Sequence, residues 1–391
     1  MTSAASPILT PFTLGPVALR NRIVKCATYE TRAKDGLVTD ALIDWHRELA
    51  DGGVAMTTLA YCSVAADGRT FKDQIWMRPA AGDGLARFAD AMHGAGAKAA
   101  IQLGHAGWFA DPKATGERPL GPSGTFSIHA QRFARAMTAA DLDRVEHDFA
   151  SAARLAVDAG FDGLEVHVGH GYLLSQFLSP YNNRRRDQYG GSLENRARFP
   201  RRIVRAVRDA AGRGVAIWAK LNMEDGFANG LSAEDGIAVA RLLATDGQLD
   251  ALQLTGGHTT KTPMFLMRGA SPLVELFGRE RNPLRRFALT LGAKLMMRHY
   301  PFEEGFFMPL ARRFRAAVDL PIMLLGGVNE QATMERALSE GFELLALGRA
   351  LIRQPDLVQR VAAGNFDGSL CTHCNRCVAY VGHAPTTCPL R

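Results

Sequence analysis

Short apolar runs recur along almost the whole chain, and polar or amphipathic stretches separate them. Each run is four to seven residues long and rich in Val, Ile, Leu and Ala. Runs of this length and composition predict β-strands. Eight strands are expected, at Ile23–Ala27, Ala55–Ala60, Ala97–Leu103, Gly163–Val168, Ala216–Leu221, Ala251–Thr255, Ile322–Gly326 and Leu344–Leu347.

Helical periodicity fills most of the segments between these strands. Eight strands that alternate with helices predict an α/β protein with a (β/α)₈ TIM barrel. A doubly wound sheet fits less well, because it should carry a GxGxxG motif after an early strand and none is present there. Helices are expected at Asp40–Asp51, Leu85–Ala95, Ala139–Ala159, Ser192–Ala211, Ala233–Thr245, Pro309–Val318 and Glu330–Glu340.

Three additions to the barrel are expected from the pattern. Residues 11–20 predict a hairpin that closes the bottom, and residues 104–138 a long loop after the third strand. Residues 256–308 form an insertion after the sixth strand, and loops of this length in a compact domain are usually functional. The barrel domain is expected to span residues 1–365, followed by a Cys-rich tail at 366–391.

The insertion contains an amphipathic helix. One interpretation is a lid packed on the barrel, and the alternative is a surface for an anionic substrate tail or a membrane headgroup. Its apolar face comprises Leu284, Phe287, Ala288, Leu291 and Leu295, with Arg285, Arg286, Lys294 and Arg298 around the remainder.

Composition and charge narrow the class of protein. The 391 residues are 47% hydrophobic and 22% charged, which is typical of a globular protein. The net charge of +7 is mostly local, because residues 261–298 hold eight Lys and Arg against Glu275 and Glu280. No nucleic-acid motif accompanies this basic patch, so we expect no nucleic-acid partner.

Membrane insertion and secretion are not expected. No apolar run reaches 18 residues, and the N-terminus lacks the basic and apolar regions of a signal peptide. Four of the six cysteines lie in the last 21 residues, a poor layout for a disulfide framework. A reduced, cytoplasmic location is therefore expected. The sequence leaves homo-oligomerisation open.

Two glycine clusters follow the last two strands. Gly326 and Gly327 come after the seventh strand, and Gly348 with Arg349 after the eighth. Barrels commonly bind phosphate at these two loops, where backbone amides approach closely because no Cβ intervenes. Ordinary strand-to-helix turns would also need glycine, but the coincidence at both loops favours phosphate binding by a substrate or a cofactor.

Polar side chains end two further strands. Gln102 ends the third strand, and Lys220 stands alone as a cation in the fifth. A buried lysine needs a negative or electron-rich partner, so the pair could hold a ring with carbonyl oxygens. The alternative is a lysine that reaches solvent from the strand end.

The fourth strand ends in His167, His170 and Tyr172, within the sequence HVGHGY. A histidine pair can bind metal, but no carboxylate or third histidine stands at ligand spacing beside it. A merely structural hydrogen-bonded pair is a further alternative. The favoured interpretation is two N–H donors and one phenol that act on a substrate.

These motifs together resemble a known family. The stretch HGYLLSQFLSPYNNRRRDQYGGSLENRARF, with NRIV at 21–24, IQLGHAG at 101–107 and GGV…LGRALIRQP at 326–355, is similar to the Old Yellow Enzyme family of FMN-dependent NAD(P)H oxidoreductases. The resemblance covers nearly the whole chain.

The resemblance implies a TIM barrel that holds FMN at its C-terminal face. Hydride from flavin N5 would reach the β-carbon of an activated alkene, His167 and His170 would hold its carbonyl oxygen, and Tyr172 would donate the proton. NAD(P)H would reduce the flavin at the same site. The implied flavin contacts are Ala27, Thr28 and Gln102 at the ring, Lys220 at N1/O2, and Gly326, Gly327, Gly348 and Arg349 at the phosphate.

Three positions depart from the family pattern. Tyr29 stands where relatives carry Thr or Cys beside the flavin C4 oxygen, Lys220 where many carry Arg, and Trp108 where Arg is common. We expect Tyr29 still to contact the flavin, and Trp108 to change how nicotinamide or substrate stacks.

The tail carries Cys371, Cys374, Cys377 and Cys388, spaced C-x2-C-x2-C-x10-C. Thiolates suit an iron–sulfur cluster or zinc, and larger family members hold a cluster in this region with wider spacing. The sequence leaves a cluster, zinc and a reduced set without metal open.

Three functions follow. An ene-reductase of α,β-unsaturated carbonyl compounds is favoured. A reductase of enoyl- or dienoyl-CoA thioesters is the alternative, with the basic insertion at the CoA phosphates. A non-catalytic flavin-binding barrel fits poorly, because His167, His170 and Tyr172 are all present.

Overall fold

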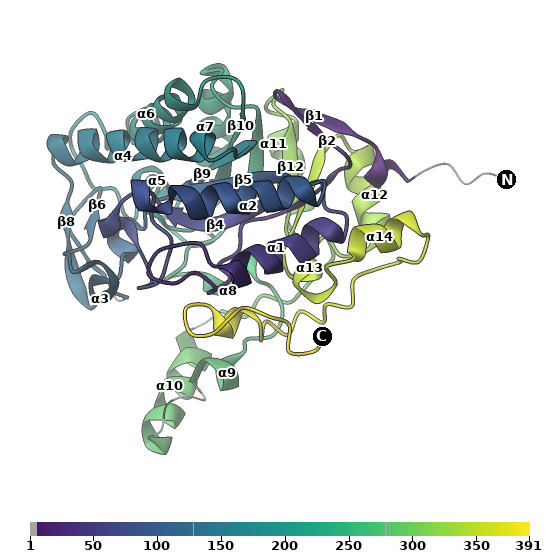
Figure 1. The fold of residues 1–391 in the computed structure, drawn as a ribbon. Coiled ribbons are helices and arrows are strands. Elements are labelled where there is room, and N and C mark those ends of the chain that lie inside the picture. Colours follow the sequence, from purple (N-terminus) through teal and green to yellow (C-terminus); the bar gives the residue numbers. More distant parts are fainter. Residues whose placement is uncertain (1–5, 128, 278–279, 281, 297) are drawn as a thin grey trace.

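The computed structural model describes the chain except residues 1–5, 128, 278–279, 281 and 297, and the side chains of residues 288 and 293–296. Eight parallel strands close into a barrel, with the last strand paired to the first (Figure 1). The predicted TIM barrel is therefore confirmed. In order around the barrel the strands are β3 (Ile23–Lys25), β4 (Met56–Ser63), β5 (Lys98–Gly104), β9 (Gly163–Val168), β10 (Ala216–Asn222), β11 (Ala251–Thr255), β12 (Ile322–Leu325) and β13 (Leu344–Leu347).

Helices surround the barrel at the predicted places. The pattern did not predict the two that follow the last strand, α13 (Arg349–Arg353) and α14 (Leu357–Ala362). Side chains cap several helix starts; Thr138 and Asp141, for example, form a reciprocal capping box at the start of the helix Ala139–Asp158. The predicted helices are α1 (Asp40–Asp51), α2 (Gly82–Gly94), α4 (Ala139–Asp158), α6 (Leu193–Ala211), α7 (Ala233–Thr245), α11 (Met308–Arg315) and α12 (Gln331–Ser339).

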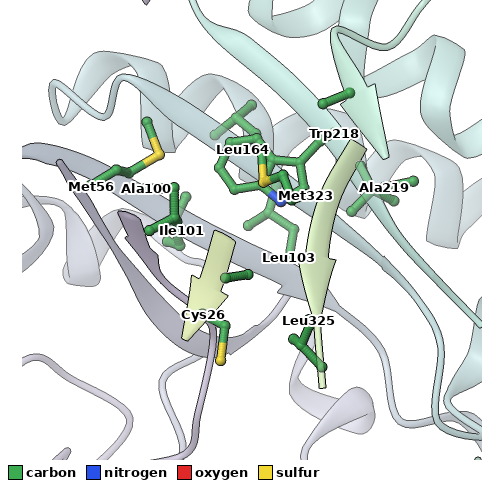
Figure 2. Packing of buried hydrophobic residues seen from close by; sticks show 14 of the residues in the cluster. Cys26, Met56, Ala100, Ile101, Leu103, Leu164, Trp218, Ala219, Met323 and Leu325 are labelled. Atoms are coloured by element: carbon green, nitrogen blue, oxygen red, sulfur yellow. The ribbon is translucent and has the colours of Figure 1, made fainter. Parts of the chain in front are cut away.

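Side chains fill the interior of the barrel. Figure 2 shows Met56, Leu164, Trp218 and Met323 among the buried residues that pack there. The Trp218 indole occupies the space beside Gly163, because a Cβ at residue 163 would lie 2.6 Å from the indole ring. The barrel centre is a packed core, so chemistry is confined to its ends.

The segment between β5 and α4 is more ordered than the long loop we expected. It contains α3 (Pro112–Thr115) and a three-stranded sheet of β6 (Leu120–Gly121), β7 (Thr125–Ser127) and β8 (Arg132–Ala136). The strands are too short to produce a clear alternation in the sequence. The N-terminal hairpin is confirmed as β1 (Phe12–Leu14) paired with β2 (Val17–Leu19).

The insertion after β11 forms α8 (Pro263–Leu266), α9 (Leu273–Phe277) and α10 (Pro283–Met296). Figure 1 shows α9 and α10 projecting away from the barrel. Leu284, Phe287 and Leu291 are exposed. The expectation that this face packs on the barrel is therefore wrong for these three residues. The side chains of the other two predicted members, 288 and 295, lie outside the description.

The Cys-rich tail runs along the same end of the barrel as the insertion. Thr386 donates its backbone N–H to the carbonyl of Glu30 at 2.8 Å and its hydroxyl to that of Tyr29 at 3.0 Å. Gly382 donates to the Thr31 hydroxyl at 2.9 Å. The tail is thereby fixed to the loop that follows β3. In the part of the chain that is described, no helix has the length and apolar character that crossing a membrane requires.

Candidate active site at the carboxyl end of the barrel

Two histidines and a tyrosine stand where β9 ends. His167 lies in the strand itself, and His170 and Tyr172 follow in the turn before α5 (Leu173–Leu178). The His167 and His170 ring centroids are 5.1 Å apart, and those of His167 and Tyr172 are 4.8 Å apart. The structure thus brings together the three side chains that the sequence predicted as the catalytic group.

The ends of the next two strands hold His170 in place. Its backbone has a φ of 60°, which is uncommon for a residue with a side chain. Its N–H donates to Asn222 Oδ1 at 3.0 Å, and its Nε2 lies 2.8 Å from Thr255 Oγ1. Our sequence analysis missed Asn222 and Thr255. The available signal was their position as polar final residues of the apolar strands β10 and β11.

Burial keeps both imidazoles neutral. It lowers the pKa of His167 well below the usual range, and the nearby His170 and Lys220 act in the same direction. Burial and Lys220 lower the pKa of His170 to about 3. Each neutral ring carries one N–H. Among the described residues the buried His167 Nδ1 has no hydrogen-bond partner, which marks a group that a ligand could satisfy.

Tyr172 retains its proton at neutral pH. Burial raises its pKa to about 12. Its ring packs edge-on against Tyr61 and Phe109, with centroids 5.2 and 5.7 Å away. Two neutral imidazoles and one protonated phenol therefore stand together, a set that can donate hydrogen bonds to an oxygen and supply a proton.

Beneath these groups lies a buried carboxylate that the sequence analysis missed. Glu165 points into the barrel two residues before His167, and its oxygens accept from Gln102 Nε2 and, at 2.8 Å, from Trp218 Nε1. Lys220 Nζ lies 2.9 Å from Glu165 Oε1. Both Glu165 and Lys220 are fully buried. A glutamate within the apolar strand GLEVHV was the signal, since such a charge needs a buried cation.

A second buried ion pair lies under the turn after β3. Lys25 Nζ is 2.7 Å from both Glu30 Oε1 and Thr28 Oγ1, and Thr28 Oγ1 donates to Glu30 at 2.5 Å. Burial raises the pKa of Glu30, but Lys25 and His46 outweigh it and lower that pKa to about 2. This pair holds Thr28, a predicted flavin contact. Two charges in the run VKCATYE were the signal for it.

Glycine is required in the turn after β12. Gly326 and Gly327 have φ values of 107° and 75°. A Cβ on Gly326 would lie 2.3 Å from the Phe307 ring, and one on Gly327 would lie 2.5 Å from Phe306. These glycines thus allow both the turn itself and the close packing of the insertion against it. Gly348 lies beside β3, where a Cβ would meet Cys26 Sγ at 3.2 Å.

The side chain of Arg349 turns toward the insertion and the tail. Its Nη1 donates to the carbonyls of Met267 and Arg268 at 3.2 and 3.0 Å, and to Asn375 Oδ1. Asn375 in turn donates to the carbonyls of Met267 and Ala270. The structure therefore places the Arg349 guanidinium in a joint between three segments, while its backbone stays at the predicted phosphate turn.

Tyr29 and Trp108, the two aromatic residues that depart from the family pattern, have different surroundings. Tyr29 stacks on Phe71 with centroids 4.7 Å apart, and burial raises the pKa of its hydroxyl. Trp108 is buried beside His258 and Tyr181, at 5.8 and 6.4 Å between centroids. Its Nε1 has no partner within the described part of the chain. Trp108 therefore belongs to an aromatic cluster, which lies close to the turn that carries His170.

The four tail cysteines line one small cavity together with Arg349. Burial raises the pKa values of Cys371 and Cys377, and Arg349 opposes that shift in both. No three Cys, His, Asp or Glu side chains of the described residues come close enough to hold a metal ion. Among the described residues the four cysteines thus do not form a metal site, and zinc or an iron–sulfur cluster at them stays a prediction.

The chain belongs to the NADH:flavin oxidoreductase / NADH oxidase family, which matches residues 7–255. The Old Yellow Enzyme resemblance is thereby confirmed, and the protein is an oxidoreductase of this FMN-dependent family.

Three relatives show the range of the family. The chain is 48% identical to a 4,4′-dithiodibutanoate disulfide reductase of Rhodococcus erythropolis, over 100% of the chain and 97% of that enzyme. It is 31% identical to a multifunctional alkene reductase/demethylase of Caballeronia cordobensis, over 94% of the chain but only 50% of that protein. A solved 2-naphthoyl-CoA reductase complex superposes with a TM-score of 0.85 at 25% identity, covering 98% of this chain and 57% of that one. The chain thus spans about half the length of two of these relatives.

The residues present fit FMN. His167 Nδ1 and both amide atoms of Gln253, on β11 beside Lys220, are buried without partners among the described residues. Gly326, Gly327 and Gly348, in the turns after β12 and β13, are partly exposed. Unpaired buried donors beside a lysine suit a ring with carbonyl oxygens, and glycine turns suit a phosphate.

Proposed function

We propose that the protein is an NAD(P)H-dependent flavoenzyme that reduces the activated C=C bond of α,β-unsaturated carbonyl compounds. The observation that carries the proposal is the group of His167, His170 and Tyr172, with rings about 5 Å apart and all three neutral at pH 7. An ionised phenol would have no proton to donate.

Separate groups of residues would hold the ring and the phosphate of FMN. Ala27, Thr28, Tyr29, Gln102 and Lys220 would contact the ring, and Gly326, Gly327, Gly348 and Arg349 the phosphate. Bound FMN supplies a hydride to the substrate after its reduction by NAD(P)H. The Lys220 ammonium would favour negative charge on the ring, moderated by its ion pair with Glu165.

The chain's own donors then stabilise charge and supply the proton. Hydride addition at the β-carbon places negative charge on the carbonyl oxygen. The N–H groups of His167 and His170 would bind that oxygen, because neutral donors held in place need no reorganisation as the charge develops. The Tyr172 phenol would protonate the α-carbon.

Tyr172→Phe tests this assignment. Cyclohexenone turnover should fall by about 10²- to 10⁴-fold, the usual contribution of a general acid, while anaerobic flavin reduction by NAD(P)H persists. Tyr181→Phe, in the neighbouring aromatic cluster, is the matched control and should leave both rates unchanged. Unchanged alkene turnover in Tyr172→Phe would remove the phenol from the mechanism.

Disulfide reduction is a second candidate, and the 48% identity to a disulfide reductase over the whole chain favours it. A hydride equivalent from NAD(P)H, which is two electrons and one proton, would reduce the S–S bond, and one further proton from solvent completes the two thiols. A thiolate, with an ordinary pKa of about 8.5, can leave without a proton from a phenol whose pKa is about 12. Tyr172→Phe should therefore spare disulfide turnover and impair only alkene turnover.

Reduction of CoA thioesters is the third candidate. The structural likeness to a 2-naphthoyl-CoA reductase and the basic insertion support it. Arg285→Glu with Arg286→Glu should then raise KM for enoyl-CoA esters and leave KM for cyclohexenone unchanged. Equal effects on the two substrates would argue against a CoA site at the insertion.

A further inference from the structure

The segment 270–299, which we term the arm, exposes large apolar side chains. Leu284 is 80% exposed, Phe287 67% and Leu291 47%. The spacing of three and four residues places these three on one face of α10. Val274 on α9, at 78%, extends the exposed apolar surface. Contiguous apolar surface of this kind marks a contact site more often than scattered single residues do.

The arm is also basic. Arg285 and Arg286 lie on α10 beside the apolar face, and both are exposed. Arg298 is exposed at the end of the arm and lies over the Tyr300 ring at 5.2 Å. The arm holds six Lys and Arg against two Glu, a net charge of +4. An apolar face with arginines beside it suits a partner that is apolar inside and anionic at its surface.

The base of the arm is fixed to the barrel. Gly269 N–H donates to the carbonyl of Tyr300 at 2.8 Å, so the two ends of the arm meet. Phe265 and Tyr300 pack edge-on at 5.3 Å, and Arg376 of the tail pairs with Glu275 at 2.6 Å. The arm therefore projects away from the barrel from a fixed base (Figure 1).

We propose that the arm docks the enzyme on the surface of an anionic lipid bilayer. Leu284, Phe287 and Leu291 would enter the boundary between headgroups and acyl chains, and the arginines would contact lipid phosphates. Charge argues against a second copy of the chain as the occupant. A two-fold contact between two arms would bring two segments of charge +4 together.

Vesicle sedimentation tests the proposal with the FMN-loaded full chain. At low salt the enzyme should sediment with vesicles of equal parts phosphatidylglycerol and phosphatidylcholine. Pure phosphatidylcholine should bind at least about tenfold less protein, because several basic residues each contribute to binding an anionic surface. Salt of about 0.5 M should release the bound enzyme, since it screens charges beyond a few ångströms.

Two variants separate the apolar and the charged contributions. Phe287→Ser should weaken binding about tenfold, and Phe133→Ser is its control, because Phe133 is 63% exposed on β8, far along the chain from the arm. Arg285→Glu with Arg286→Glu should weaken binding by about tenfold or more. Arg154→Glu with Arg241→Glu changes the net charge equally at exposed helix positions and is the matched control. Flavin content and thermal unfolding confirm that each variant is folded.

Several results would overturn the proposal. These are failure to bind anionic vesicles, equal binding to both vesicle types, or equal losses in Phe287→Ser and Phe133→Ser. A dimer in light scattering that Phe287→Ser dissociates, without vesicle binding, would assign the face to a second copy instead. None of these results depends on which substrate the active site reduces.

Discussion

At the scale of the residue, the side chains of His167, His170 and Tyr172 share one property, which is that burial keeps each of them uncharged. The same desolvation lowers the pKa of an imidazole and raises that of a phenol. His170, with a pKa of about 3, is neutral above pH 4, and Tyr172, with a pKa of about 12, is protonated throughout the ordinary range. The site therefore holds its donors ready over a wide span of pH.

A flat pH profile follows from these values. Reoxidation of the reduced enzyme by cyclohexenone should vary less than about twofold between about pH 5 and pH 10, because neither His170 nor Tyr172 titrates in that window. Stopped-flow measurement of the oxidative step alone excludes ionisations that affect NAD(P)H. An inflection near pH 6.5 would instead indicate a histidine that acts as a cation.

The pair of Lys25 and Glu30 makes a prediction about stability. Glu30→Gln should lower the free energy of unfolding by about 3–5 kcal/mol at pH 7, since it leaves Lys25 buried without its counter-charge. The folded-state pKa of Glu30 is about 2, below its ordinary 4.5. The stabilisation is thus present above pH 4.5 and is lost as pH falls toward 2.

Denaturant unfolding of the flavoprotein at several pH values measures both effects. The difference between wild type and Glu30→Gln should shrink between pH 4.5 and pH 3. Lys25→Met with Glu30→Leu removes both charges and should cost much less than the single change. A double variant as unstable as Glu30→Gln would show that packing, and not charge, is responsible.

At the scale of the element, strand register decides which side chains meet. Lys220 lies opposite His167 on one side and Gln253 on the other, and Gln102 lies opposite Glu165. The sequence predicted polar residues at the ends of three strands, Gln102, His167 and Lys220, because each strand shows its own pattern. It did not predict the pairing of Lys220 with Glu165, because that pairing depends on register between strands about 50 residues apart.

The turn after β12 allows a test by one methyl group. Gly326→Ala should weaken FMN binding and cost about 1–3 kcal/mol of stability, because a φ of 107° and the Phe307 ring both oppose a Cβ. Fluorescence titration with FMN gives the affinity. Gly94→Ala, at the end of α2, is the control, since its φ lies outside the left-handed region and a Cβ there would meet no atom within 4 Å. Equal FMN affinity and stability in both variants would show that a Cβ at residue 326 causes no strain.

The whole molecule is a barrel whose carboxyl end is crossed by two additions, the insertion and the tail. Patterning predicted the barrel and the places of both additions. It did not predict that they would meet, because Arg349, Asn375 and the carbonyls of residues 267–270 carry no periodic signal. It also gave the wrong partner for the apolar face of α10, since amphipathicity shows only that a helix has an apolar side.

Asn375 tests how these parts are joined. Asn375→Ala removes an acceptor from Arg349 and donors from two carbonyls, at a cost of about 1–3 kcal/mol for the buried groups left unpaired. Protease cleavage within residues 270–299 should accelerate. Asn375→Gly loses the same amide but tolerates the φ of 57°, so matching rates in both variants would assign the effect to the amide. If Asn375→Ala were cleaved at the wild-type rate, Asn375 would not be what holds the insertion to the tail.

The hydrogen bond between Gly269 and Tyr300 has a consequence for how this sequence can change over time. Because the arm, residues 270–299, leaves the barrel and returns to it at one point, it can be removed as a unit. A short glycine linker between 269 and 300 would bridge the gap without moving β11 or β12. Related proteins could therefore gain, lose or exchange the arm during evolution, and so change where the enzyme resides, while the active site stays the same.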